Sequence, residues 1–364
     1  MGDSSVNIFD GTTKAAHRDR AAYLGGDSDP LLSTVTERLL DRLEDCRRSF
    51  AHAAVLGGAA QYVVPALFGG RAGVERITVI DTSKDMLDRV RALEARARTN
   101  AEAASSGGSG SDGGGGSGGG GGEVARPWPV VSYVHMEGEV LPVEPGSFDL
   151  VVSSLGLHWF NDLPTIIAQC RFALRPDGLM LSALFGGESL QELRISCALA
   201  QMERLGGVSP VVSPLAQVRD AGNLLTRAGL AMPTVDLDTF RLRYECPTEV
   251  VRHLRSMGES NGVVHRQRVL ARDVPLAAAA VYRSMFGEES DGSVPATFQV
   301  MYLTGWSPHE SQQKPKERGS ATMSFQDLAE GLVKEGAVSG STGEGGEEGG
   351  SCGATPQSPP PAAK

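Results

Sequence analysis

A histidine and a tryptophan follow an apolar run near the middle of the chain. The run is Phe-Asp-Leu-Val-Val-Ser-Ser at 148–154, and His158-Trp159 come shortly after it. Such a run is typical of a strand buried on both faces, and the loop after it is free to meet a ligand. Histidine is the usual acid or base near neutral pH, and tryptophan can wall a pocket or stack on a cation. His158 and Trp159 are therefore candidate catalytic residues, although packing beneath the next helix would explain Trp159 equally well.

A second polar group lies further along the chain, in Met-Gly-Glu-Ser-Asn at 257–261. Glu259 and Asn261 carry the carboxylate and amide oxygens that suit the planar donors of a guanidinium. They are candidate substrate-binding residues. The alternative is that these residues form only a polar cap at the end of a helix.

Short apolar runs alternate with helical patterns, which predicts an α/β fold with a mostly parallel sheet and helices on both faces. Strands are expected at 53–57, 76–81, 130–135, 148–154, 178–185, 233–244 and 296–306. Helices are expected at 84–98, 188–205, 215–228, 247–258 and 275–286. In such a fold the carboxyl ends of neighbouring parallel strands converge, so we expect Asp81 and His158 to line one pocket.

Motifs in the second half of the chain resemble one family. They are Phe-Gly-Gly-Glu-Ser-Leu-Gln-Glu-Leu-Arg at 185–194, Met-Gly-Glu-Ser-Asn at 257–261, Ala-Ala-Ala-Val-Tyr-Arg at 278–283, Asp-Gly-Ser-Val-Pro-Ala-Thr-Phe-Gln at 291–299 and Glu-Arg-Gly-Ser-Ala-Thr at 317–322. The run at 148–154 and its surroundings resemble the class I S-adenosylmethionine-dependent methyltransferases. The later motifs narrow this to the family of mitochondrial NADH:ubiquinone oxidoreductase (complex I) assembly factor five. That arginine-hydroxylase and methyltransferase-like family is related to the malonyl-carrier-protein methyltransferase of biotin synthesis.

The resemblance implies a class I methyltransferase (Rossmann-like) fold, with a seven-stranded sheet, helices on both faces and a helical cap. It divides the chain into an N-terminal lid segment at 1–40, a methyltransferase core at 41–186, and a cap with the last sheet strands at 187–332. Residues 105–122 are almost only glycine and serine and are expected to form a flexible insert in the core. Residues 333–364, rich in Gly, Glu, Ser and Pro, are expected to form a disordered tail.

The resemblance also implies a site for S-adenosylmethionine at the ends of the strands. Gly57 and Gly58 would form the glycine turn after the first strand, where the backbone approaches the cofactor. Asp81 would accept hydrogen bonds from the ribose hydroxyls, although it can at the same time cap the next helix. Glu137 would lie near the adenine amino group, and Ser153, near the end of the fourth strand, would also contact the cofactor.

The glycine turn departs from the family pattern of an acid followed by Gly-x-Gly-x-Gly. Val55 replaces the acid, and Ala59 and Gln61 replace the second and third glycines. Alanine costs about 1 kcal/mol at a position that needs a positive φ, and Gln61 would project towards the cofactor or the following helix. Either the site has drifted without chemical demand, or the turn is reshaped for weaker or different binding. We expect S-adenosylmethionine to bind weakly.

Composition excludes several classes of protein. The net charge of −10 argues against nucleic-acid binding, and no apolar run approaches the length of a membrane span. The five cysteines form no Cys-x-x-Cys pair, so neither a disulfide framework nor a zinc site is expected. His135 and Glu137 have the spacing of two iron ligands, but no third ligand is identifiable, so we expect no metal.

The family's activity is hydroxylation of an arginine in a complex I subunit. This implies a protein substrate and a place in the mitochondrion, peripheral to the matrix side of the inner membrane, although no arginine-rich transit segment is visible. Methylation of that subunit is equally compatible with the fold, because methyl transfer needs little beyond a positioned acceptor. Two alternatives are a carrier-protein or small-molecule methyltransferase of the biotin-synthesis type and a catalytically silent assembly scaffold.

Overall fold

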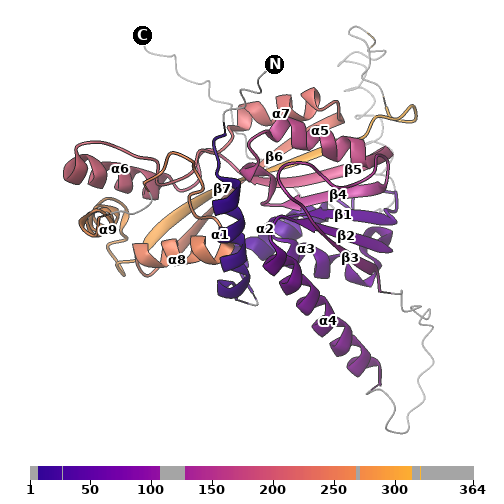
Figure 1. Cartoon of the computed structure of the whole chain (residues 1–364), viewed down its shortest axis with the longest axis horizontal. Coiled ribbons are helices and arrows are strands. Elements are labelled where there is room, and N and C mark those ends of the chain that lie inside the picture. Colours follow the sequence, from indigo (N-terminus) through magenta and orange to yellow (C-terminus); the bar gives the residue numbers. More distant parts are fainter. Residues whose placement is uncertain (1–6, 27, 107–127, 268–270, 314–319, 321–364) are drawn as a thin grey trace, which may run out of the picture. The chain divides into compact units, whose positions relative to one another are not determined.

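Seven strands form one sheet in the order β3-β2-β1-β4-β5-β7-β6 (Figure 1). They are β1 (His52–Leu56), β2 (Arg76–Asp81), β3 (Val130–His135), β4 (Phe148–Ser154), β5 (Leu174–Phe185), β6 (Ala231–Tyr244) and β7 (Val294–Trp306). The first five run parallel, and β7 is antiparallel to both β5 and β6. The predicted seven-stranded sheet is confirmed, and β2, β3 and β4 begin and end at the predicted residues.

This computed structural model describes residues 7–26, 28–106, 128–267, 271–313 and 320. The expected insert at 105–122 lies outside these ranges, except for two serines that end the helix α4 (Lys84–Ser106). The expected tail at 333–364 lies outside them entirely. Residues 1–312 make one unit, to which all that follows belongs.

Helices precede β1 and separate most of the later strands, and those predicted at 188–205, 215–228, 247–258 and 275–286 are confirmed to within three residues at each end. Besides α4 the helices are α1 (Gly11–Leu24), α2 (Pro30–Asp41), α3 (Ala60–Ala66), α5 (Leu163–Ala173), α6 (Gln191–Leu205), α7 (Val218–Arg227), α8 (Pro247–Met257) and α9 (Asp273–Phe286), with 3₁₀ segments η1 (Phe68–Gly73) and η2 (Leu157–Trp159). The helix α4 is longer than predicted, because Ala and Glu, which favour helices, continue beyond residue 98 towards the glycine-rich segment. Within the described ranges, no helix is both long and apolar enough to cross a membrane.

Two apolar clusters cover the two faces of the sheet. Consecutive residues of a strand point to opposite faces. Accordingly Val79 and Ile80 of β2 belong to different clusters, as do Val152 and Val151 of β4. All seven residues of β4 are buried, as the apolar run at 148–154 predicts for a central parallel strand.

The segment before α1 is tied to the loop that follows α8. Phe9 forms an antiparallel bridge with Val263, and the N–H of Asp10 donates to the carbonyl of Gly262 at 2.8 Å. The Asp10 side chain then caps α1 by accepting the N–H of Thr13 at 3.1 Å. In Figure 1, α1 runs between α8 and the sheet, and it packs against both α8 and α4. This docking places α1 at the carboxyl edge of the sheet.

Candidate functional site

A cavity of about 670 Å³ lies at the carboxyl edge of the sheet, beside α1. Its volume is in the range of about 300–1,000 Å³ that is typical of small-molecule sites. The predicted site residues that line it are Gly57, Gly58, Asp81, Glu137, Trp159 and Glu259. Three others, His158, Ser153 and Asn261, are not among its lining residues.

The two glycines of the turn after β1 differ in how much space surrounds them. Both have positive φ, +48° at Gly57 and +54° at Gly58. A Cβ on Gly58 would lie 2.0 Å from the carbonyl oxygen of Ser154, because the turn runs directly against the end of β4. A Cβ on Gly57 would meet no atom within 4 Å. Gly58 therefore packs one strand end against another, whereas Gly57 leaves open space beside the cavity.

The departures from the family's glycine pattern do not reach the cavity. Ala59 has φ −88°, so the strain considered for an alanine with positive φ does not arise. Its N–H donates to the carbonyl of Ser154 at 2.7 Å. Gln61 does not line the cavity, and its Oε1 is buried with no hydrogen-bond partner among the described residues. The long side chain of Gln61 thus turns away from the space available to a cofactor.

Asp81 ends β2 at the cavity wall and is only 2% exposed. One carboxylate oxygen accepts the N–H of Ser83 at 2.9 Å, whereas the helix α4 is capped by Ser83, whose hydroxyl accepts the N–H of Met86 at 3.0 Å, so Asp81 does not itself cap the helix. The other oxygen accepts a hydrogen bond from the guanidinium of Arg18, on α1, at 2.5 Å. Each carboxylate oxygen can accept two hydrogen bonds, which leaves capacity for two ribose hydroxyls. Any ribose must nevertheless share this acid with Arg18.

Glu137 stands at the outer part of the wall. Its side chain is 89% exposed, and its Oε1 lies 4.0 Å from Nδ1 of His135. The other ring nitrogen of His135 is hydrogen-bonded to the carbonyl of Thr82 at 3.1 Å. In the part of the chain that the structure describes, no group of three or more His, Cys, Asp or Glu side chains could hold a metal ion.

Ser153 and Asn261 hold backbone segments together instead of facing the cavity. The hydroxyl of Ser153 is fully buried and donates to the carbonyl of Leu56 at 2.9 Å, which joins β4 to β1. The Asn261 side chain accepts the hydroxyl of Ser213 at 3.1 Å and donates to the carbonyl of Pro210 at 2.8 Å. Their polar atoms are used by the fold, so neither geometry supports a ligand contact.

Glu259 is the centre of a buried polar cluster. Nε1–H of Trp159 donates to its two carboxylate oxygens, at 3.0 Å each, and Nε2 of His158 lies 3.0 Å from one of them. An ionised carboxylate only accepts hydrogen bonds, so Nε2 of His158 carries a proton. Sequence reasoning put these three residues in two separate hypotheses, and the structure joins them.

The expectation that His158 lines a pocket with Asp81 is wrong. The 3₁₀ segment η2 turns the imidazole inward, where its side chain is 1% exposed and its ring lies 5.3 Å from that of Phe185. His158 therefore contacts Glu259 without lining the cavity, whereas Trp159 and Glu259 both line it.

Lys14, on α1, places its ammonium on the same cluster. Its Nζ lies 3.1 Å from the centre of the Trp159 ring, 2.6 Å from the carbonyl oxygen of Gly258 and 3.9 Å from Oε1 of Glu259. Burial lowers the pKa of Lys14. Burial also opposes ionisation of Glu259, but the positive charge of Lys14 and the contact with His158 outweigh it and hold the pKa of Glu259 below its usual value. Glu259 is thus an ionised carboxylate in a nearly dry site.

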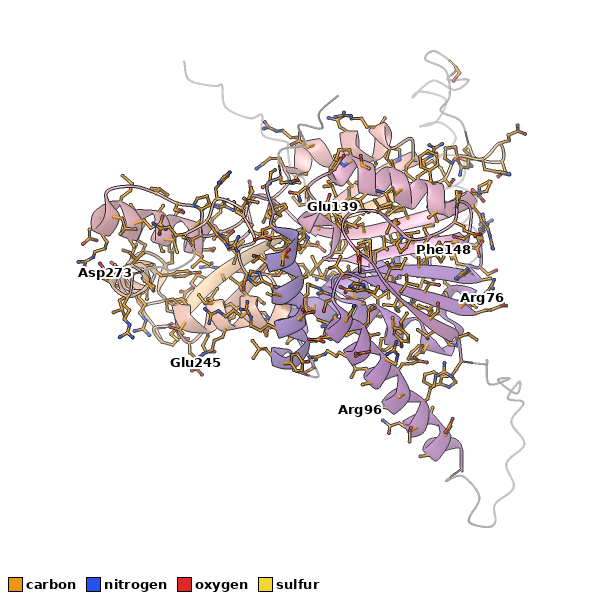
Figure 2. The ribbon with its side chains drawn as sticks, viewed as in Figure 1. Arg76, Arg96, Glu139, Phe148, Glu245 and Asp273 are labelled. Carbon is orange, nitrogen blue, oxygen red and sulfur yellow. The ribbon has the colours of Figure 1, made fainter. Side chains whose placement is uncertain are left out.

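A chain of hydrogen bonds fixes the third side of the cavity. Glu139, labelled in Figure 2, accepts the backbone N–H of Asn161 at 2.8 Å and its side-chain NH₂ at 2.9 Å. Asn161 in turn accepts the N–H groups of Ile8 and Phe9, at 2.8 Å each. The loops after β3 and β4 and the segment before α1 are joined in this way. No pattern in the sequence pointed to Glu139 or Asn161. Lys14 and Arg18 were not predicted either, because they become neighbours on one helix face only through α1, for which no helix was predicted.

The strand order, the glycine turn and the acid that ends β2 define a class I methyltransferase fold. Residues 120–182 match the family described as a methyltransferase domain. That match covers the third and fourth strands and part of the fifth.

The particular family follows from longer matches. The chain is 40% identical over 326 residues to the "Arginine-hydroxylase NDUFAF5, mitochondrial" of Danio rerio, covering 89% of this chain and 90% of that protein. It is also 40% identical over 326 residues to the Homo sapiens protein of the same name, covering 89% and 84%. A "Malonyl-[acyl-carrier protein] O-methyltransferase" of Xylella fastidiosa is 35% identical over 182 residues, 50% of this chain and 59% of that one. The chain belongs to the mitochondrial NDUFAF5 family, the methyltransferase-like proteins of complex I assembly.

Proposed function

We propose that this chain binds S-adenosylmethionine in the cavity and modifies an arginine of a complex I subunit there, by hydroxylation, as the name of its relatives states for them. The observation that carries the proposal is Glu259, a buried and ionised carboxylate that accepts the indole N–H at the edge of the Trp159 ring. It lies on the wall of the same cavity as Asp81. A guanidinium can stack on an aromatic face and at the same time donate hydrogen bonds to a carboxylate at the edge of that ring.

The residues present fit the cofactor that the family implies. Gly57 leaves open space where its Cβ would stand, Asp81 offers two oxygens with remaining capacity, and Ile80 and Met136 add apolar wall. Glu137 lies on the solvent-exposed part of the cavity wall, where its carboxylate can accept a hydrogen bond from the adenine amino group. Bound S-adenosylmethionine would supply an electrophilic methyl group for methyl transfer. Hydroxylation would instead take one oxygen atom from dioxygen as a co-substrate, with two electrons from a reductant that convert the other oxygen atom to water.

We also propose that the cofactor binds weakly. The reason is not the altered glycine pattern but the ion pair between Asp81 and Arg18. The ribose hydroxyls must share Asp81 with the guanidinium of Arg18, and both partners of that ion pair are buried. Shifting Arg18 would leave a buried charge without its partner, which is unfavourable. A ribose that displaced Arg18 from Asp81 would therefore bind at the expense of this ion pair.

The division of labour along the chain is part of the same proposal. Residues 1–40 act as a lid, 41–186 as the cofactor-binding core, and 187–332 as a cap that receives the protein substrate. In support, the lid contributes Lys14 and Arg18 to the cavity wall, and the cap contributes Glu259. The complex I subunit would reach this site from the matrix side of the inner membrane, where the protein would bind peripherally.

The mass of the substrate subunit tests the reaction. Complex I subunits are isolated from mitochondria that contain the wild-type protein, Glu259→Gln or no protein, and their peptides are weighed. A gain of about 16 mass units on an arginine, present only with the wild type, is expected for hydroxylation. The matched control is Glu249→Gln, an exposed glutamate of α8 that pairs with Arg252, and it should retain the gain.

Methylation is the second candidate, favoured by the methyltransferase-domain match and by a cavity that suits the cofactor. A gain of about 14 mass units would replace hydroxylation by methyl transfer. An unchanged mass in every sample, with complex I still dependent on the protein, would reject both reactions in favour of an assembly scaffold.

A further inference from the structure

Lys14 is held in the way a cationic ligand is held. Its ammonium lies over the face of Trp159, with the carbonyl of Gly258 and the carboxylate of Glu259 on its other sides. These four residues come from three parts of the chain: Lys14 from α1, Trp159 from the segment η2, and Gly258 and Glu259 from the loop after α8. Three of them, Lys14, Trp159 and Glu259, line the cavity. The surroundings form a cation site, and a side chain of the protein itself fills it.

The ammonium fits this site incompletely. It has three N–H donors, and among the described residues it makes one hydrogen bond, to the carbonyl of Gly258 at 2.6 Å. Oε1 of Glu259, at 3.9 Å, is beyond hydrogen-bonding distance. Burial further weakens the charged form of the amine. The carboxylate is therefore only partly neutralised by Lys14.

A guanidinium would satisfy the same groups better. It is planar, so it can stack on the Trp159 ring, and its five donors form a fork that reaches a carboxylate and a carbonyl together. The two oxygens of Glu259 accept from Trp159 and His158 and still have capacity for further donors. An arginine side chain could make the short contact with Glu259 that Lys14 does not make.

The helix α1 repeats this arrangement one turn further on. Arg18 lies four residues after Lys14 and neutralises Asp81, the other buried carboxylate of the cavity. One face of one helix thus supplies a cation to each of these two carboxylates. Lys14 and Arg18 together keep both charges compensated when the cavity contains no ligand.

We propose that Lys14 is an internal stand-in for the arginine of the protein substrate. The substrate guanidinium takes the place of the ammonium between Trp159, Glu259 and Gly258, and Lys14 withdraws on its flexible side chain towards the start of α1. This inference rests on the proposed function, because it names where the arginine binds. The site is then open only in the fraction of molecules in which Lys14 has withdrawn, and apparent affinity falls by that fraction.

A small probe tests the exchange without any reaction. N-acetyl-arginine amide, and its neutral counterpart N-acetyl-citrulline amide, are titrated into the full-length protein while indole N–H resonances are followed by NMR. The chain has three tryptophans, so Trp159→Phe identifies the relevant signal. In the Lys14→Met variant, which keeps the apolar side chain and loses the charge, the arginine probe should bind about tenfold more tightly than in wild type. The citrulline probe should bind neither protein.

Two variants make the comparison specific. Glu259→Gln should lose arginine binding, and Arg20→Met, which removes an exposed cation of α1 that contacts Ser260, should bind as the wild type does. Equal or weaker binding in Lys14→Met than in wild type overturns the inference, since Lys14 would then be a permanent counter-ion of Glu259. A Lys14→Met gain matched by Arg20→Met also overturns it, because a general loss of positive charge would explain both.

The wild-type protein alone provides a second test, which holds even where a variant fails to fold. When the arginine probe saturates the site, amide hydrogen exchange in α1 should accelerate, because Lys14 no longer anchors the helix. Unchanged or slower exchange in α1 contradicts the inference. Tight binding of the probe by Lys14→Met, with no mass gain on any complex I subunit, would reject the proposed reaction and leave the arginine site standing.

Discussion

The two halves of the cavity are built in different ways. The cofactor half consists of residues that directly follow strands, such as Gly57 after β1 and Asp81 at the end of β2. The substrate half joins Lys14, Trp159 and Glu259, which are far apart in the sequence and meet only through the docking of α1 and α8. In the first half, geometry is fixed by the sheet itself. In the second half, it depends on long-range contacts among buried charges, so the two halves should respond differently to substitution.

The largest effect is expected in the cofactor half, from Gly58→Ala. The new Cβ would stand 2.0 Å from the Ser154 carbonyl oxygen at a positive φ, so the end of β1 must move away from β4. We expect a loss of more than about 4 kcal/mol in the free energy of unfolding, or no folded protein. Gly57→Ala is the matched control: it adds the same methyl group to open space and should cost about 1 kcal/mol. Urea denaturation measures both, and similar losses would show that the sheet does not fix this turn.

The substrate half is expected to lose about 3 kcal/mol with Glu259→Gln, because Lys14 is left buried without a counter-charge. Lys14→Met should then restore part of the loss when both changes are combined. A double-mutant cycle in urea would give a coupling energy of about 1–3 kcal/mol between these two residues. Strict additivity would mean that the long-range ion pair does not stabilise this half.

Cofactor binding itself should weaken by about 1–3 kcal/mol with Asp81→Asn, through poorer acceptance of the ribose hydroxyls. Calorimetric titration with S-adenosylmethionine measures the change. The control is Asp88→Asn, an exposed aspartate of α4 that pairs with Arg91, and its affinity should equal that of wild type. Equal affinity for Asp81→Asn would remove this residue from the cofactor half.

The smallest expected effect is a dependence of the free energy of unfolding on pH, and it comes from His17 on α1. Burial, with added repulsion from Lys14 and Arg20, lowers the pKa of His17 to about 4. Between that value and the ordinary pKa of about 6.5, the unfolded chain binds more protons than the folded one, so stability falls as the pH falls through this window.

Because the ring is only partly buried, we expect His17 to contribute a loss of about 1 kcal/mol on acidification from pH 6.5 to pH 4. Urea unfolding at several pH values measures it, and His17→Gln should flatten the slope, whereas His309→Gln, at an exposed position, should leave it unchanged. A slope that persists in His17→Gln would assign the acid sensitivity to other groups.

The sequence predicted the parts of this molecule that depend on local pattern. Burial on both faces makes a strand such as β4 a continuous apolar run, and the position of Asp81 follows from its place at the end of the predicted strand β2. The inward turn of His158 was not predictable, because an imidazole after a strand can point either way. Arg18 and Lys14 were missed for a related reason: on a helix surface a cation is ordinarily solvated, and only the docking of α1 buries it. Ser153 was expected at the cofactor, yet its hydroxyl bonds the adjacent strand, which strand order alone does not reveal.

The bridge between Phe9 and Val263 has a consequence for the synthesis of the chain. The two residues are about 250 positions apart, an interval of roughly 13–50 s at a translation rate of about 5–20 residues per second. Throughout that time α1 has neither its bridge partner nor the carboxylate of Glu259, and in the later part of it, after residue 154 has been added, β1 to β4 already exist. Closing so long a loop is slow relative to forming local structure. The nascent protein therefore passes through a stage in which the parallel strands can pair while Trp159 and the two cations of α1 are exposed to other proteins, including chaperones.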